Sequence, residues 1–509
     1  MKRHIAIGLS LFLFLVLVLT GVLMISVVEP PDAPATQEEK TLRVVMPGSQ
    51  NEGLDFGKAR TWYPWVIVGN VCDTLVAERD GKLVYQLASE ITPNTDASQW
   101  TLRLRPGVRF SDGSALTSGD VFASLQFLSR SMGFGSFFQD VDFKASRIVD
   151  DRTLTLMLTR PRADLVTTVL SAASMVWKQG QGDAHIPVCS GAYRVAQFTA
   201  SEGALLTRNL HAWQPALWFD RIEIRPLGDP TARVNALLSG AADFAFDIPV
   251  TNAKQVTDRK GFQVLRSGVA NASSWYFALN SRVKPFDDRQ VRQALKMLIN
   301  RQQFVDVVLG GYGYVGNDVF GQGLTGYDST LKQRQQEVAA AQTILREKGV
   351  TTLHMLTADL TPGLNDASEL LRQQLADAGI TLTLERVEPA DYLSSLPRLH
   401  QAQMIAMFAL NRPFIATLPM LFGAENPYNY GGWYPPEFAQ RVEQARTTLE
   451  RSSQQQRLNQ LQQQLWEEGP YLLWGYRDQL SAMREGFSGV ELSQGIPLFR
   501  QVRPMTGQE

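Results

Sequence analysis

The sequence predicts an α/β fold with mixed sheets, and two observations carry this prediction. Between residues 220 and 390, short apolar segments alternate with segments of helical character. Repetition of strand, helix and strand is typical of α/β layers in which part of the sheet is parallel. In addition, residues 100–105 and 152–158 alternate apolar and polar side chains, which predicts half-buried strands.

The same patterns place the individual elements along the chain. The predicted strands are 42–46, 100–105, 152–158, 221–225, 275–279, 352–356 and 380–384. The predicted helices are 67–75, 117–128, 230–238, 287–300, 335–348 and 367–378, with Thr117 as an N-cap and Gly349 and Gly379 as C-caps. Trp62-Tyr-Pro-Trp65 is expected in a loop, and the Gln-rich segment 454–464 is compatible with an exposed helix.

Length and charge restrict the class of partner. The chain has 509 residues, so roughly two to four domain-sized units are expected at about 100–200 residues each. Lys and Arg number 49 against 50 Asp and Glu, which gives a net charge of -1. Because there is neither a basic excess nor a basic stripe, we do not expect a nucleic-acid partner.

The N-terminus has the features of an export signal. Lys2, Arg3 and His4 precede an uncharged run at residues 5–28, and a basic start before an apolar run directs export. As a helix the run would extend about 36 Å, long enough to span a bilayer as an uncleaved anchor. The alternative is a signal peptide cleaved near Ala33-Pro-Ala35. Residues 29–41 are Pro-rich and polar, as in a linker, and both readings place the rest of the chain in the periplasm or elsewhere outside the cytoplasm.

The two cysteines, Cys72 and Cys189, would lie in an oxidising compartment after export. They are therefore expected either to form one disulfide or to remain as two separate buried thiols.

The sequence contains no pattern that indicates catalysis or a bound metal. Gly-x-Ser-x-Gly, His-Glu-x-x-His, a phosphate-binding Gly-rich loop with Lys, and Cys-x-x-Cys are all missing. The histidines at 4, 185, 211, 354 and 400 lack ligand spacing, and Ser190-Gly191 is better explained as a turn than as a nucleophile. We therefore expect a binding protein that uses no cofactor and no metal ligand.

Five segments in order resemble one known family, the bacterial extracellular solute-binding proteins of family 5, which include the dipeptide-, oligopeptide- and nickel-binding proteins of ABC importers. The segments are 100–110, 111–121, 187–194, 233–243 and 280–295, that is WTLRLRPGVRF, SDGSALTSGDV, PVCSGAYR, RVNALLSGAAD and Asn280 with PFDDRQVRQAL. Cys189 and Ala192 depart from the pattern of the third segment.

The resemblance implies a two-lobed periplasmic-binding-protein clamp with a ligand cleft between its lobes. One lobe would comprise residues 42–269 and 476–509, and the other residues 270–475. Such a protein closes its cleft on a small solute and delivers it, as a monomer, to ABC permease subunits in the membrane. The alternatives are a membrane-anchored sensing or scaffold domain of the same fold and, less favoured, a hydrolase.

The expected ligand site departs from that of the peptide-binding members. Those members carry an acidic residue in the second lobe that pairs with the α-ammonium of the peptide. The corresponding segment here, 404–414, contains Asn411 and Arg412 but no carboxylate. Arg412 is expected either to bind a carboxylate or another anion, or to be a solvated loop arginine. Loop aromatic residues complete the expected ligand-binding set, unless they only fill gaps at the lobe edges: Trp62, Tyr63 and Trp65 in the first lobe, and Phe414, Tyr428, Tyr430 and Trp433 in the second.

Overall fold

The computed structural model describes residues 39–48, 52–55, 61–79, 81–131, 134–181, 184, 186–214, 217–394, 396–424 and 426–505. The chain divides into Met1–Lys40 and Thr41–Glu509, and the fold described below belongs to the second unit. The predicted export segment at 5–28 and most of the linker lie outside the described residues. Within the described ranges, no helix combines the length and the apolar character that crossing a membrane requires.

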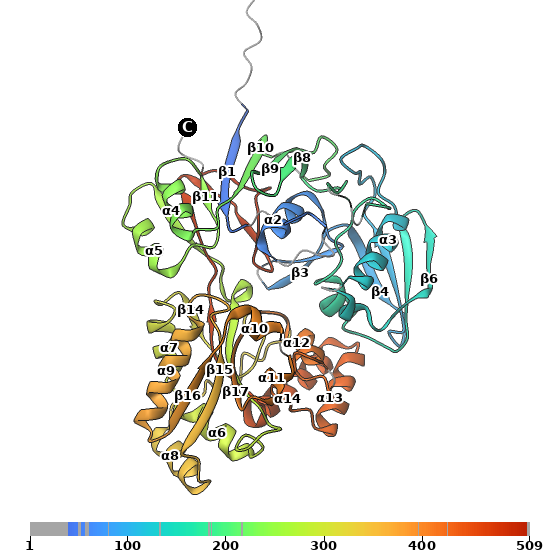
Figure 1. The fold of residues 1–509 in the computed structure, drawn as a ribbon. Coiled ribbons are helices and arrows are strands. Elements are labelled where there is room, and N and C mark those ends of the chain that lie inside the picture. The colour runs from blue at the N-terminus through green and yellow to red at the C-terminus, as the bar shows by residue number, and fades with distance from the viewer. Residues whose placement is uncertain are drawn as a thin grey trace, which may run out of the picture. The chain divides into compact units, whose positions relative to one another are not determined.

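A seven-stranded mixed sheet has the order β12-β19-β11-β1-β10-β9-β8 (Figure 1). Strand β1 (Thr41–Met46) pairs in parallel with β10 (Arg221–Pro226) and with β11 (Phe244–Ala245). The remaining pairs are antiparallel and involve β8 (Tyr193–Thr199), β9 (Gly203–Arg208), β12 (Phe262–Arg266) and β19 (Leu480–Arg484). The strands predicted at 42–46 and 221–225 are thus neighbours in this sheet.

Helices cover both faces of this first sheet. The side chains of β1 alternate between the two faces and therefore pack into two different cores. Val45 packs with Val234 of α4 (Pro230–Leu238), and α5 (Val250–Thr257) lies in the same cluster. Val44 and Met46 point to the other core, which includes Val66 and Ile67 of α2 (Trp62–Val71).

A smaller antiparallel sheet adjoins this core. Its order is β4-β5-β7-β6, with bounds Ala88–Pro93, Gln99–Leu104, Thr153–Leu158 and Val141–Asp150. Helix α3 (Ser118–Arg130) begins with a capping box, in which the Thr117 backbone N–H donates to Asp120 at 2.8 Å. The predicted strands at 100–105 and 152–158 and the predicted helix start at Thr117 are confirmed. Three two-stranded antiparallel pairs complete this part. Two are hairpins, β2 (Val76–Arg79) with β3 (Lys82–Tyr85) and β21 (Glu491–Ser493) with β22 (Ile496–Leu498), and the third joins β20 (Phe487–Ser488) to β23 (Arg503–Pro504).

The second large sheet has six strands in the order β14-β18-β13-β17-β15-β16. Strand β15 (Thr352–Thr357) runs parallel to β16 (Thr381–Arg386) and to β17 (Met404–Leu410). Strands β13 (Ser273–Leu279), β18 (Tyr471–Arg477) and β14 (Gly313–Val315) pair antiparallel. The predicted mixture of parallel and antiparallel pairing is confirmed.

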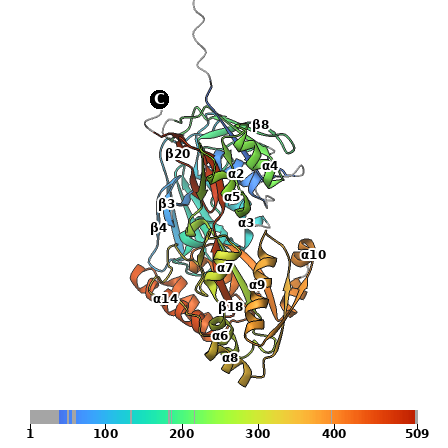
Figure 2. The same ribbon diagram turned by 90° about the vertical axis from the view of Figure 1, so that its left-hand side faces the viewer.

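This second sheet also has helices on both faces, and Figure 2 shows α14 and α9 on opposite sides of β18. One face packs on α6 (Arg289–Leu298), α8 (Val338–Glu347) and α9 (Leu364–Asp377). The other packs on α12 (Phe414–Leu421), α13 (Pro436–Thr447) and α14 (Arg451–Glu468). Three short helices connect these layers: α7 (Arg301–Val307), α10 (Pro389–Ser394) and α11 (Leu396–Gln401).

The chain passes between the two large sheets twice, from β12 to β13 and from β18 to β19. The carboxylate of Asp478, which is fully buried, links the two crossovers. It accepts hydrogen bonds from Arg266 Nε at 2.6 Å and from the Gly268 backbone N–H at 3.0 Å. The Asp478 side chain therefore links the two described segments through which the chain passes from one large sheet to the other.

Three local predictions were wrong. Trp62-Tyr-Pro-Trp65 is the first turn of α2 and not a loop, because Pro64 occupies a position whose N–H has no partner within a helix. The helix predicted at 287–300 divides into α6 and α7, since the Asn300 side chain accepts from the Gln303 N–H at 3.1 Å and caps a new helix. The Gln-rich helix is not wholly exposed, because Gln462 is fully buried and donates to the Gly326 carbonyl at 2.9 Å.

Candidate ligand-binding site

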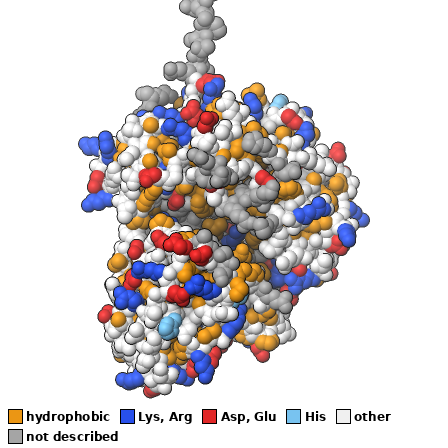
Figure 3. All heavy atoms as spheres, in the orientation of Figure 1, with side chains coloured by type: hydrophobic (Ala, Val, Ile, Leu, Met, Phe, Trp, Pro, Cys, Tyr) orange, Lys and Arg blue, Asp and Glu red, His pale blue; other side chains and the backbone are white. Residues whose placement is uncertain are grey.

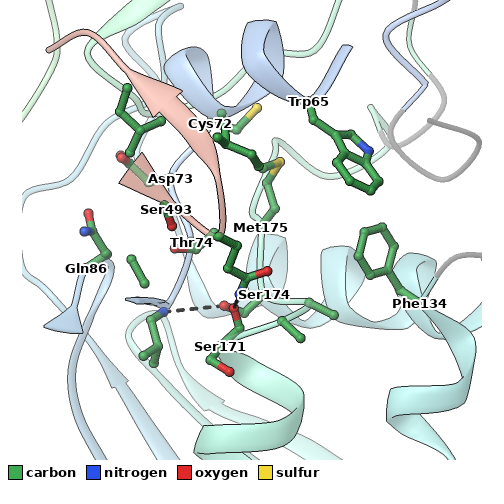
Figure 4. A pocket seen from close by; sticks show the side chains of 18 of the residues that line it. Trp65, Cys72, Asp73, Thr74, Gln86, Phe134, Ser171, Ser174, Met175 and Ser493 are labelled. Atoms are coloured by element: carbon green, nitrogen blue, oxygen red, sulfur yellow. Dashed lines mark hydrogen bonds between the residues drawn. The ribbon is translucent and has the colours of Figure 1, made fainter. Parts of the chain in front are cut away.

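A cavity of about 100 Å³ lies between α2, β2 and the β21–β22 hairpin on one side and the end of β17 on the other. In the space-filling view, the surface is hollowed between the elements of the two sheets (Figure 3). Figure 4 shows Trp65 and Phe134 on one side of the cavity and Asp73 and Gln86 on the other. Further lining residues come from four segments: Cys72–Ala77 after α2, Ser171–Met175, Leu410 and Arg412 after β17, and Ser493–Arg500 around β22.

The loop after α2 is held rigidly in the wall of the cavity. In the structure, Cys72 forms a disulfide with Cys189, so that this loop is bonded to a segment 117 residues further along the chain. Two positions later in that segment, the Gly191 N–H donates to the Val71 carbonyl at 2.9 Å. A Cβ on Gly191 would lie only 2.5 Å from that oxygen, so the close approach of the two backbones requires glycine.

Asp73 contributes a carboxylate to the cavity wall, but its oxygens are already occupied. They accept from Trp213 Nε1 at 2.8 Å, from Gln214 Nε2 at 2.9 Å and from Ser190 Oγ at 3.0 Å. Burial raises the pKa of Asp73, and these hydrogen bonds oppose that rise. Asp73 therefore stabilises the wall and is poorly placed to bind a cationic ligand.

Arg412 is the charged group of the cavity with the fewest partners. Its guanidinium carbon lies 5.4 Å from the ring centroid of Phe137, in the geometry of a cation–π contact. Among the described residues it has neither a hydrogen-bond acceptor nor an ion-pair partner within 4 Å. Burial lowers the pKa of Arg412, and the negative charge of Glu78 opposes this effect. The donors of Arg412 are thus available for an anion.

Glu78 on β2 is a carboxyl group whose negative charge acts on Arg412. It is 6% exposed, and burial raises its pKa to about 7, while the charge of Arg412 lowers it. No described residue donates a hydrogen bond to its carboxylate. Arg500, a second cation in the cavity wall, is paired with Glu491 at 3.0 Å, so Arg412 is the cation that favours a negatively charged ligand group.

The structure separates the other residues that the sequence singled out. Trp65 lines the cavity, and its buried Nε1 has no acceptor among the residues that the structure describes. Tyr63 is fully buried and packs near Phe198. Trp62 lines a second cavity. Asn411 donates to the Val269 and Gln322 carbonyls at 2.9 and 2.8 Å, which is a structural contact.

The aromatic residues expected in the second lobe do not line this cavity. Phe414 is fully buried at the start of α12, and Tyr430 and Trp433 belong to the same core cluster. Trp433 packs edge-on against Phe438 with ring centroids 4.9 Å apart. Tyr428 is 52% exposed and contacts Tyr430. These four rings support the helices that follow β17.

Sequence reasoning did not identify the segment 171–175 or the β21–β22 hairpin as parts of the site, nor Glu78 as a charge that acts on it. Glu78 carried a weak signal, as an acidic residue next to the apolar residues of a short strand. Within the described part of the chain, no cluster of three His, Cys, Asp or Glu side chains is arranged to hold a metal ion.

Comparison with known proteins agrees with this architecture. The glutathione-binding protein GsiB of Escherichia coli K12 is 26% identical over 317 residues, which are 60% of this chain and 61% of that protein. The match therefore spans about three fifths of the relative's length. Two solved structures share the fold at 18% identity. HbpA2 of Haemophilus parasuis has a TM-score of 0.80, and the match covers 91% of this chain and 100% of that one. DppA of Helicobacter pylori in complex with the peptide STSA has a TM-score of 0.72, and the match covers 92% of this chain and 99% of that one.

The DppA structure is that of an ABC transporter-associated periplasmic binding protein, so the predicted two-lobed binding-protein fold is confirmed. Residues 82–415, well over half of the chain, match the sequence model of the middle region of the bacterial extracellular solute-binding proteins, family 5. The chain therefore belongs to that family, as the five segments that resemble it predicted.

Proposed function

We propose that this protein is the extracytoplasmic substrate-binding component of an ABC importer. In this role the monomer takes a small organic or peptide-like solute into the cavity around Arg412 and delivers it to permease subunits. Family membership supports the proposal. So do the names of similar proteins, one of which is described as glutathione-binding and another as ABC transporter-associated and peptide-bound. The proposal assigns binding and no catalysis to the cavity.

The observation that carries the proposal is that α2, β2 and the β21–β22 hairpin, all within the first predicted lobe, line the cavity together with Leu410 and Arg412 at the end of β17, within the second. A solute in this position contacts both, and can therefore hold them together. We propose that residues 42–269 with 476–509 and residues 270–475 act as two lobes that close about the crossovers at Asp478. Closure around a solute buries most of its surface, as binding clefts require.

Arg412 defines the class of ligand in this proposal. A guanidinium that has no hydrogen-bond acceptor among the described residues favours a carboxylate or another planar anion, which it binds with two parallel hydrogen bonds. The solute therefore has an anionic group at the end that faces β17.

The test begins with a thermal-shift screen of the full chain against glutathione, short peptides, opines, sugars and metal chelates. A ligand present at about 100 times its Kd stabilises the folded state by about 2.7 kcal/mol, which is a readily measured rise in Tm. Failure of every compound class to raise Tm would contradict the proposed function.

Calorimetry with the best compound then tests Arg412. Arg412→Ala is expected to weaken binding by well over tenfold, because truncating one partner of a buried charge pair costs about 2–5 kcal/mol. Arg412→Lys is expected to recover only part of the affinity, since lysine lacks the bidentate geometry. Equal affinities of the wild type and Arg412→Ala would remove Arg412 from the site.

The proposal also requires that the binding unit is outside the cytoplasm, directed there by residues 5–28. A phosphatase fused after residue 60 is expected to be active, because such a fusion works only when exported. A stable but inactive fusion would count against export. Mass spectrometry of the mature N-terminus distinguishes an intact anchor from cleavage near Ala35.

A further inference from the structure

A third cavity, of about 300 Å³, lies beside β14, the edge strand of the second sheet. Its wall consists of residues 299–302 at the junction of α6 and α7, Val315 of β14, and residues 333–336 before α8. All of these residues belong to the second predicted lobe, and the cavity shares no described lining residue with the one that contains Arg412. A ligand in the third cavity is therefore distinct from the proposed solute.

Arg301 and Arg334 bring two guanidinium groups to the wall of this cavity, and both pair with the same carboxylate. Arg301 Nη2 donates to Asp318 Oδ1 at 2.8 Å, and Arg334 Nε donates to Asp318 Oδ2 at 2.7 Å. The side chains of the two arginines are 3% and 6% exposed, and that of Asp318 is fully buried. Asp318 is not part of the described wall, so the charged groups that line the cavity are the two arginines.

Lys296 adds a third positive charge to the same cluster. It is fully buried, and its Nζ donates to the Gly469 carbonyl at 2.7 Å. Burial lowers the pKa of Lys296 to about 7; the charge of Asp318 opposes this effect, and the charges of the neighbouring arginines strengthen it. Three buried cations therefore share one buried carboxylate, which leaves a surplus of positive charge inside the second lobe.

This surplus has no internal counter-charge. Within the described part of the chain, Asp318 supplies the one carboxylate within ion-pair distance of these three side chains. Donors remain unused as well: among the described residues, the buried Arg301 Nε has no acceptor, and Arg334 Nη1 donates to no atom. Because buried charge destabilises a fold unless it is paired and hydrogen-bonded, the cluster favours an anion that supplies both negative charge and acceptors.

We infer that this third cavity binds a tetrahedral oxyanion with two negative charges, as in inorganic phosphate or a phosphate monoester. Two negative charges match the surplus of the cluster, and guanidinium groups bind phosphate oxygens with charge-assisted hydrogen bonds. The side-chain amides of Gln333 and Gln335 line the same wall, and each has a second N–H besides the one that it donates to a backbone carbonyl. The bound anion links the α6–α7 junction to the segment before α8, so it stabilises the second lobe and takes no part in solute transport.

Calorimetry and thermal unfolding of the full chain test the class of ligand. The probes are inorganic phosphate, sulfate, glycerol phosphate and acetate, at an ionic strength held constant with sodium chloride. The first three are expected to bind and to raise Tm, and acetate is expected to bind at least tenfold more weakly because it has one charge. Tighter binding of glycerol phosphate than of phosphate identifies an organic phosphate as the source, and the reverse identifies the free ion. If none of the dianions binds, or if acetate binds as tightly as phosphate, the inference is wrong.

A variant that supplies the missing charge from within the chain tests the position of the site. Gln335 is exposed and lines the cavity, so Gln335→Glu places a carboxylate in the wall without disturbing the buried cluster. The variant is expected to raise Tm of the unliganded chain and to weaken phosphate binding at least tenfold, because the new carboxylate takes the place of the anion. Gln197→Glu, at an exposed position of β8 in the first sheet, makes the same change in net charge and is expected to alter neither quantity. Equal phosphate affinity of the two variants would overturn the inference.

Arg412→Ala separates this site from the proposed solute cavity. The variant is expected to keep the phosphate affinity of the wild type, because Arg412 does not line the third cavity. Loss of phosphate binding in Arg412→Ala would assign the anion to the first cavity and overturn the inference, while the solute-binding function would stand. Conversely, phosphate binding that only Gln335→Glu weakens supports the third cavity whether or not a transported solute is found.

Discussion

Glu78 makes the stability of the protein depend on pH. Burial raises its pKa to about 7 from an ordinary value of 4.5. Because its folded pKa lies above its unfolded pKa, the stability that protonated Glu78 contributes is complete below pH 4.5 and is lost as pH rises through about 7. Glu78→Gln is therefore expected to be more stable than the wild type at pH 8, by on the order of 3 kcal/mol, and nearly equal to it at pH 4.5.

Urea unfolding at both pH values measures this difference. The exposed Glu90, whose side chain is 54% exposed beside Arg103, supplies the control variant Glu90→Gln, which is expected to be close to neutral. A gain for Glu78→Gln that is the same at both pH values would show that Glu78 does not titrate as described.

The same carboxyl group should regulate binding of an anion. When Glu78 is protonated it no longer neutralises the field of Arg412, so an anionic solute is expected to bind more tightly below pH 7 than above it. Calorimetry at pH 6 and pH 8 measures the change, which Glu78→Gln should abolish. The idea fails if the wild type and the variant show the same dependence on pH.

At the scale of elements, the contact between α2 and the segment after Cys189 decides the shape of the cavity. Gly191→Ala is expected to destabilise the chain by about 1–3 kcal/mol, because its Cβ would lie 2.5 Å from backbone that is fixed by the adjacent disulfide. The comparison is Gly53→Ala, where the added Cβ meets no atom within 4 Å. Thermal unfolding of both variants is the measurement, and equal Tm values would contradict the close approach.

At the scale of the whole molecule, a buried ion cluster joins α13 to the part of the chain that contains the small sheet. Arg446 donates to Asp164 at 3.3 Å and to Asp140 at 3.4 Å, and Arg162 pairs with both aspartates. Each of these four side chains is nearly buried. Opening the proposed lobes must separate Arg446 from the aspartates, so the cluster favours the closed arrangement.

Arg446→Met is therefore expected to shift the unliganded chain towards an open form and to increase its radius of gyration in small-angle scattering. Arg441→Met is the matched control on the same helix, because within the described residues the only hydrogen bond of the Arg441 side chain is to Gln464 of α14, at 3.2 Å. A saturating ligand should reduce the radius of both variants. If Arg446→Met and the wild type have the same radius without ligand, the cluster does not control closure.

The sequence by itself determined the class of the fold, the family and most element positions. Strands such as β1 and β5 and helices such as α4 were predictable because side-chain periodicity, capping residues and glycines act over a few neighbouring residues. It also indicated Trp65 and Arg412, both of which line the first cavity.

Only the tertiary structure decided which side chains meet. Glu78 influences Arg412, and Asp247 lines one cavity with Arg477, across hundreds of residues of chain. The aromatic residues Tyr430 and Trp433 were expected either as ligand walls or as fillers of gaps at the lobe edges, and they belong to the core cluster on one face of the second sheet. Local patterns specify whether a segment is a helix or a strand, but the neighbours of a charge depend on how sheets assembled from distant segments are placed, and no short-range periodicity encodes that placement.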